Sequence, residues 1–225
     1  MKRLPVVAYV VIIVVAGLTG ELTGRLFYAD NQPFKGIFGA AEHQPLYTTT
    51  DAKLLEHLTS GQFSPLGWAD LLPPEDRRLL EKYQATPTVP MEEQFLTAIE
   101  ASQDRAYQST MRSTAHVTTL DGNAVTLNGF IVPLEADNEQ NILRFFLVPY
   151  FGACLHFPPP APNQMVYVVS KGGFKMADIN SAYSVSGILG NAMYEDPLGT
   201  AAYVMDAVTI SRFNGQPDDL RNHQQ

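Results

Sequence analysis

The chain has 225 residues, enough for one good-sized domain with appendages or for two small domains. With 45% hydrophobic and 17% charged residues it can build a core and is not compositionally disordered. Its net charge of -8, from 15 basic and 23 acidic residues, argues against nucleic acid or an anionic membrane surface as the main partner.

Residues 1–24 predict a signal peptide or a signal anchor. Lys2 and Arg3 precede an uncharged run, rich in valine and isoleucine, from Leu4 to Gly20. Its apolar part of about 15 residues is longer than a minimal signal sequence and shorter than a comfortable membrane-spanning helix. Because the basic residues come first, we expect the remainder in the periplasm or cell envelope, anchored in the inner membrane if the segment stays uncleaved. A buried N-terminal strand or helix is the alternative.

Residues 25–50 show no sustained hydrophobic period and predict a linker. Residues 51–110 predict a helical segment that packs on the domain after it. Its first helix has Asp51 as N-cap and stops at Gly61. A second helix is expected to begin near Pro74, with acidic residues in its first turn.

The third helical stretch, MEEQFLTAIEASQDRAYQ at residues 91–108, is the clearest. Apolar and small residues recur at helical spacing on one face, namely Phe95, Ala98, Ile99, Ser102 and Ala106. The opposite face is charged. This pattern predicts an amphipathic helix.

Residues 116–213 predict a β domain, because the hydrophobic period changes there from about four to two. Two β-rich runs around Asp121-Gly122-Asn123 predict a hairpin. Further strands are expected at ILRFFLVPYF, MVYVVS, YSVSGILG and TAAYVMDAVTISRF, with a weak helical interruption at KMADINS.

Five or six short strands predict a mainly β fold, a small OB-like β-barrel behind the helical segment and the N-terminal apolar helix. An SH3-like barrel and a small sandwich remain alternatives. Gly129 and Gly187 lie within strands and predict bulges or sharp bends. Residues 214–225 predict a flexible tail.

The only cysteine of the chain lies in FFLVPYFGACLHFPPPAPNQMVYVV, residues 145–169. If this block is extended, Cys154 and His156 point to the same side, because alternate residues of a strand share a face. The prolines behind them favour a rigid, extended course. The sequence therefore predicts a Cys-x-His pair on a stiff, proline-rich loop over the mouth of the barrel.

Three chemistries fit this pair. A thiolate and an imidazole bind zinc, with copper(I) as the runner-up. The remaining ligands could come from a second protein or from His116, Glu135, Asp137, His43 or His57. A buried cysteine that serves only in packing is the second alternative. A thiol enzyme built from Cys154, His156 and Asn163 is the third and least favoured.

The runs LNGFIVPLE, FFLVPYFGACLHFPPPAPNQMVYV and GTAAYVMDAVTI resemble a bacterial envelope family catalogued as a domain of unknown function, over roughly residues 66–212. Its members are exported, often lipoproteins, with the hallmark G-A-C-x-H-x-P-P-P-x-x-N-Q. The hallmark residues that match with functional potential are Cys154, His156, Asn163 and Gln164. The chain has no cysteine directly after its N-terminal apolar run, unlike the lipoprotein members.

The resemblance implies a place beside components of an ABC transporter for envelope substrates, some of whose gene clusters look tied to zinc supply. It implies no enzymatic activity. We therefore expect a metal-binding accessory of a transport system, with transporter components as partners and no nucleic acid. The alternative is a metal-free interaction module whose contact residues are Pro158, Pro159, Pro160, Asn163 and Gln164.

Overall fold

The computed structural model describes residues 45–83, 90–152 and 160–217. The predicted signal segment, most of the predicted linker, Cys154 and His156 lie outside these ranges. Among the described residues, no helix combines the length and apolar character needed to cross a membrane.

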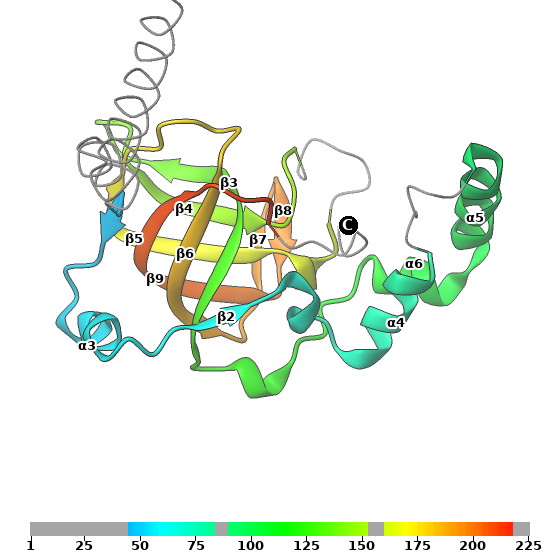
Figure 1. Ribbon diagram of the computed structural model, residues 1–225, viewed down its shortest axis with the longest axis horizontal. Helices are drawn as coiled ribbons and strands as arrows, with labels where there is room; N and C mark the ends of the chain where they lie inside the picture. Colours follow the sequence, from blue (N-terminus) through cyan, green and yellow to red (C-terminus); the bar gives the residue numbers. More distant parts are fainter. Residues whose placement is uncertain (1–44, 84–89, 153–159, 218–225) are drawn as a thin grey trace, which may run out of the picture. The chain divides into compact units, whose positions relative to one another are not determined.

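Five strands close into a barrel (Figure 1), namely β3 (Ala124–Ala136), β4 (Ile142–Val148), β5 (Val166–Phe174), β6 (Ala182–Gly190) and β9 (Tyr203–Phe213). Around the barrel the order is β3, β4, β5, β9, β6 and back to β3. Every pair is antiparallel except β5 with β9. This is the Greek-key order of an OB barrel, so the predicted mainly β, OB-like fold is confirmed.

Four shorter strands accompany the barrel. β1 (Tyr47–Thr48) pairs with β9, and β2 (Ser64–Leu66) runs parallel to β3. β7 (Tyr194–Asp196) and β8 (Gly199–Ala201) form a separate antiparallel hairpin. The sequence pattern did not predict these four strands, because runs of two or three residues carry no measurable period.

The barrel strands alternate between two apolar clusters, as their period of two requires. On β4, Phe145 and Leu147 belong to the main core, whereas Phe146 and Val148 belong to a second cluster. Tyr194 of the β7–β8 hairpin packs on this second cluster. All four β4 side chains are buried as a result.

The hairpin also covers aromatic rings of β4 and β5. Tyr194 stacks on Tyr167 with ring centroids 3.6 Å apart and meets Phe146 edge-on at 6.1 Å. In OB proteins that bind oligonucleotides, the face of the second and third barrel strands carries the ligand. Here the rings of Phe146 and Tyr167 on those strands are already packed against Tyr194.

The burial of Tyr167 should make the stability of the protein depend on pH in the alkaline range. Burial raises the pKa of its phenol to about 12. Because the unfolded phenol ionises near 10 while the folded one stays neutral, the free energy of unfolding should fall as pH rises from 10 to 12. We expect the Tyr167→Phe variant to lose less stability over this range in urea unfolding curves. Identical pH dependence in the two proteins would contradict this assignment.

Both predicted strand glycines sit where strands approach closely. A Cβ atom on Gly129 would lie 2.6 Å from the carbonyl oxygen of Val148, and one on Gly187 would overlap the carbonyl oxygen of Asp206. The β6–β9 register also shifts between Ser186 and Gly187, as the predicted bulge requires.

Two predicted elements of the β domain differ from the structure. Residues Thr118–Leu120 form a short 3-10 helix, η2, so the first strand of the predicted hairpin is wrong. The segment 175–181 holds turns instead of the predicted helical interruption, with the Asp178 side chain accepting hydrogen bonds from Asn180 and Ser181. Short polar side chains of this kind favour turns over helices.

Within residues 51–110 the described helical elements are α3 (Ala52–Ser60), η1 (Trp68–Leu71), α4 (Pro74–Lys82), α5 (Met91–Gln103) and α6 (Arg105–Thr110). Asp51 caps α3 and Gly61 ends it in a left-handed conformation, as predicted. The third predicted helix is broken at Asp104, which is extended and whose carboxylate accepts from the N–H groups of Ala106 and Tyr107. Asp104 therefore caps a new helix.

Candidate functional site

The site is built around η3 (Pro162–Gln164), the 3-10 turn that ends the proline-rich block. The side chains of Asn163 and Gln164 are buried there, with exposed fractions of 0% and 6%. Buried amides of this kind need hydrogen-bond partners inside the protein. The structure therefore places both hallmark amides in the interior, and not on a surface open to a partner.

Asn163 joins the turn to α4. Its Nδ2 donates to Oδ2 of Asp76 at 2.8 Å and to the carbonyl oxygen of Ala115 at 3.1 Å. Both partners are acceptors, so the amide orientation is set by chemistry: the NH₂ group must face them. The buried Oδ1 has no donor among the described residues.

Gln164 joins the same turn to η1. Its Nε2 donates to the carbonyl oxygen of Trp68 at 2.9 Å. The indole of Trp68, which is fully buried, donates in turn to the carbonyl oxygen of Asn128 on β3 at 2.7 Å. These hydrogen bonds connect the end of the proline-rich block to η1 and, through Trp68, to β3 of the barrel.

Tyr203 of β9 completes this junction. Its hydroxyl donates to the carbonyl oxygen of Leu71 at 2.7 Å and accepts from the N–H of Val117 at 2.7 Å. Burial raises the pKa of this phenol, since the charged form would lose its hydration. One buried hydroxyl therefore holds the backbone of η1 and the segment at Val117, which precedes the first barrel strand.

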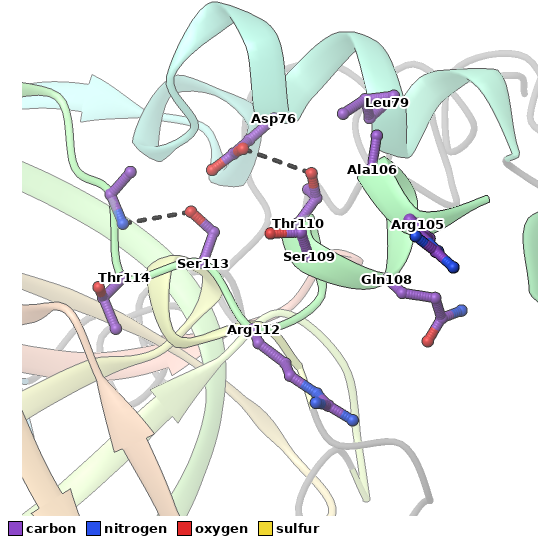
Figure 2. Close-up of a pocket in the computed structure, with 11 residues that line it drawn as sticks. Asp76, Leu79, Arg105, Ala106, Gln108, Ser109, Thr110, Arg112, Ser113 and Thr114 are labelled. Atoms are coloured by element: carbon purple, nitrogen blue, oxygen red, sulfur yellow. Dashed lines mark hydrogen bonds between the residues drawn. The ribbon is translucent and has the colours of Figure 1, made fainter.

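Asp76 also borders a cavity of about 980 Å³ between α4, α6 and residues 112–115 (Figure 2). Thr110 Oγ1 approaches Asp76 Oδ1 at 3.4 Å, a weak hydrogen bond. Arg105 and Arg112 extend away from Asp76, as Figure 2 shows. This cavity is open, with a mixed polar and apolar lining, and no residue that the sequence predicted as a ligand is among the described residues that line it.

The further metal ligands proposed from the sequence are separated and have other partners. Glu135 pairs with Arg144 at 2.8 Å. Asp137 closes a turn, and hydrogen bonds from the side chain and backbone of Asn141 hold its pKa below the ordinary value. The ring of His116 lies edge-on to Tyr203 at 6.3 Å.

Within the described ranges, no three His, Cys, Asp or Glu side chains are grouped closely enough to hold a metal ion. The structure does not bring His116, Glu135 and Asp137 together there. Cys154, His156, Pro158 and Pro159 lie outside the described ranges. Pro160 is described and buried.

A second cavity, of about 390 Å³, borders Pro160 and was not predicted. Its lining includes three methionines, Met111, Met165 and Met193. Met165 is buried, whereas Met193 is 61% exposed. These residues are dispersed over more than 80 positions of the chain, so no sequence motif could reveal them; the fold brings them to the end of the hallmark block.

Comparisons with known proteins give one family and one structure. The family model described as "Protein of unknown function (DUF3299)" matches residues 68–212. The crystal structure of a DUF3299 family protein from Pseudomonas aeruginosa PAO1 is 30% identical, with a TM-score of 0.50, over 68% of this chain and 97% of that chain. None of the curated proteins matches. The matched range begins at Trp68, the residue that locks η1 onto the barrel.

Proposed function

The chain belongs to the DUF3299 family, and on that premise we propose that it is an exported envelope protein that binds a metal ion through Cys154 and His156. Its role would be that of a metal-handling accessory to a membrane transport system. The family description assigns no activity. The proposal rests on the chemistry of the hallmark block and on what surrounds it.

The observation that carries the proposal is the methionine-lined cavity beside Pro160. In the sequence His156 is four positions before Pro160, and Cys154 is six positions before it. The hydrogen bonds of Asn163 and Gln164 hold the chain just after Pro160. In sequence, two soft or borderline ligands thus lie a few positions before a residue that borders a cavity with three thioethers.

The three methionines of this cavity bear on which metal ion the proposed site would bind. Zinc sites use thiolate, imidazole and carboxylate ligands, whereas thioethers are ligands of copper(I). The sequence block alone favours zinc; the methionines favour copper(I). A single cysteine in an oxidising compartment cannot form a disulfide within the chain, which leaves its thiolate free for either ion.

Metal analysis of full-length protein purified without chelators tests the proposal. We expect near-stoichiometric copper or zinc in the wild type, by elemental mass spectrometry, and none in the Cys154→Ser/His156→Ala variant. If copper(I) is the ion, Met193→Leu should weaken its binding by about 10-fold or more, since a ligand is lost while the volume is kept. Met91→Leu, on an exposed helix outside the cavity, is the matched control.

The opposite result is equally clear. Protein that binds neither ion after copper or zinc is added under reducing conditions would leave Cys154 with a packing role and would end the metal proposal. If the double variant lost its cooperative unfolding transition, a packing role for Cys154 would again be indicated. If the double variant unfolded like the wild type but bound no metal, the metal proposal would stand.

The competing proposal is a metal-free interaction module at the same block. The inward orientation of Asn163 and Gln164 and the burial of Pro160 leave only part of the proposed contact set for a partner. Unchanged capture of transporter components by the Cys154→Ser variant, with and without chelator, would favour this module. A thiol enzyme is less well supported, because the Asn163 amide is already bonded to Asp76 and Ala115.

A further inference from the structure

The amphipathic helix α5 turns its apolar face outward. Four large side chains of this helix are exposed: Met91 by 85%, Phe95 by 65%, Leu96 by 60% and Ile99 by 39%. Met91, Phe95 and Ile99 are spaced by four residues and lie on one face, with Leu96 at its edge. An apolar helix face normally packs toward the core, so this orientation is the reverse of the usual one.

The side of α5 that faces the protein is the less apolar one. Gln94 and Thr97 are half-buried, and Ala101 is the buried residue of the helix. These positions lie about 100–160° away from Phe95 on a helical wheel. The helix therefore packs through small and polar side chains and leaves its largest apolar ones uncovered.

Side-chain contacts hold the C-terminal end of α5 in this orientation. The hydroxyl of Tyr83 donates to Asp104 Oδ2 at 2.7 Å, and the Tyr83 ring meets that of Tyr107 at 4.9 Å. Lys82 pairs with Asp104 at 3.4 Å and with Glu100 at 3.6 Å. The hydrogen bond from Tyr83 lowers the pKa of Asp104, which keeps this carboxylate charged for both partners.

We propose that the outward face of α5 docks into an apolar groove of a partner protein whose rim carries lysine or arginine. Met91, Phe95 and Ile99 supply anchors at the spacing by which helices enter grooves. Glu92 and Glu93 flank these anchors and form no ion pair within the described part of the chain. Their charge is thus available for a basic rim, which would set specificity and speed association.

Charge argues against the two other occupants. Helices that lie in a membrane surface carry lysine and arginine on their polar face, whereas MEEQFLTAIEASQ has neither. A second copy of the chain would bring Glu92 and Glu93 close to further acidic side chains, in a protein whose net charge is already -8. The partner surface is therefore a basic-rimmed protein groove.

This surface is independent of the proposed metal site. None of the α5 residues lines the methionine-bearing cavity, and the docking variants leave Cys154 and His156 unchanged. Metal content should therefore be the same in the docking variants as in the wild type. Either proposal can fail while the other stands.

Photocrosslinking in the cells that produce the protein tests the docking surface. A photoreactive amino acid replaces Phe95 in the full chain, and the matched control carries it at Glu56, an exposed position of another helix. We expect one protein adduct from Phe95 and none from Glu56. The crosslinked peptide of that adduct should combine apolar residues with lysine or arginine.

Charge reversal decides whether such an adduct is the proposed complex. Glu92→Lys/Glu93→Lys should lower its yield by about 10-fold or more, and Glu92→Gln/Glu93→Gln by a smaller factor, with wild-type circular dichroism in both. The neutral pair keeps the test valid if the reversed pair unfolds α5. An adduct with lipid, an adduct with a second copy, no adduct, or an adduct unaffected by both pairs would overturn the proposal.

Discussion

Replacing Trp68 with alanine is expected to lower the free energy of unfolding by about 3–5 kcal/mol, the range for deleting a large buried aromatic side chain. Trp68 is fully buried, and its ring passes close to Gly129 at the point where β3 and β4 meet. The substitution would also remove the hydrogen bond from the indole N–H to the carbonyl oxygen of Asn128. Urea unfolding at neutral pH measures the loss.

Trp68→Phe separates packing from hydrogen bonding at this position. Phenylalanine fills much of the space but cannot donate to Asn128, so a smaller loss of about 1–3 kcal/mol is expected, mainly from the unpaired carbonyl. A loss below about 1 kcal/mol for the alanine variant would contradict the role assigned to Trp68, because it would mean that η1 does not depend on the barrel.

The barrel was predictable because its strands are long and carry a period of two. Runs such as ILRFFLVPYF place alternate side chains in two clusters, and glycines at 129 and 187 marked the close approaches. The β7–β8 hairpin was not predictable. Its strands have three residues each, and only the fold shows that Tyr194 covers Tyr167.

For α5 the sequence predicts the faces of the helix but not their direction. Spacing identifies the apolar stripe through Phe95 and Ile99, and the usual rule turns such a stripe inward. The orientation of α5 departs from that rule because the break at Asp104 ends α5 and starts α6. Aspartate is a favoured N-cap residue, so this break could have been read from the sequence.

For the proline-rich block, too, the sequence predicts some features and the fold alone shows others. Its motif singled out Asn163 and Gln164, but the motif could not say that both amides point inward. The partner of Asn163, Asp76, is 87 residues earlier in the chain and belongs to no motif. Contacts at such separations depend on the whole fold, as does the grouping of Met111, Met165 and Met193.

The Asn163→Asp variant should be among the most destabilised single-site variants at pH 7. It would place a carboxylate against Asp76 and against the carbonyl oxygen of Ala115 in a fully buried position, where the wild-type amide donates to both. Introducing an unpaired buried charge beside a like charge should cost about 3–5 kcal/mol. Urea unfolding curves of the two proteins give the difference.

The loss should shrink in acid, and the sign follows from proton linkage. In the folded variant the buried carboxyl group at position 163 and the half-buried one of Asp76 would share one proton, so the folded state would bind protons more tightly than the unfolded state. The stability of the variant relative to the wild type should therefore rise as pH falls from 7 toward the ordinary aspartate pKa of about 3.9. A loss that is independent of pH would show that lost packing, and not charge, is the cause.

Asn141→Asp is the matched control for this prediction. Asn141 donates to Asp137 over the same 2.8 Å that joins Asn163 to Asp76, but on a turn that solvent reaches. Water and salt screen a pair of like charges there, so we expect a loss below about 1 kcal/mol. If the two variants lost equal stability, burial at η3 would not explain why an amide stands at position 163. A large difference would tie that amide to the contact between η3 and α4.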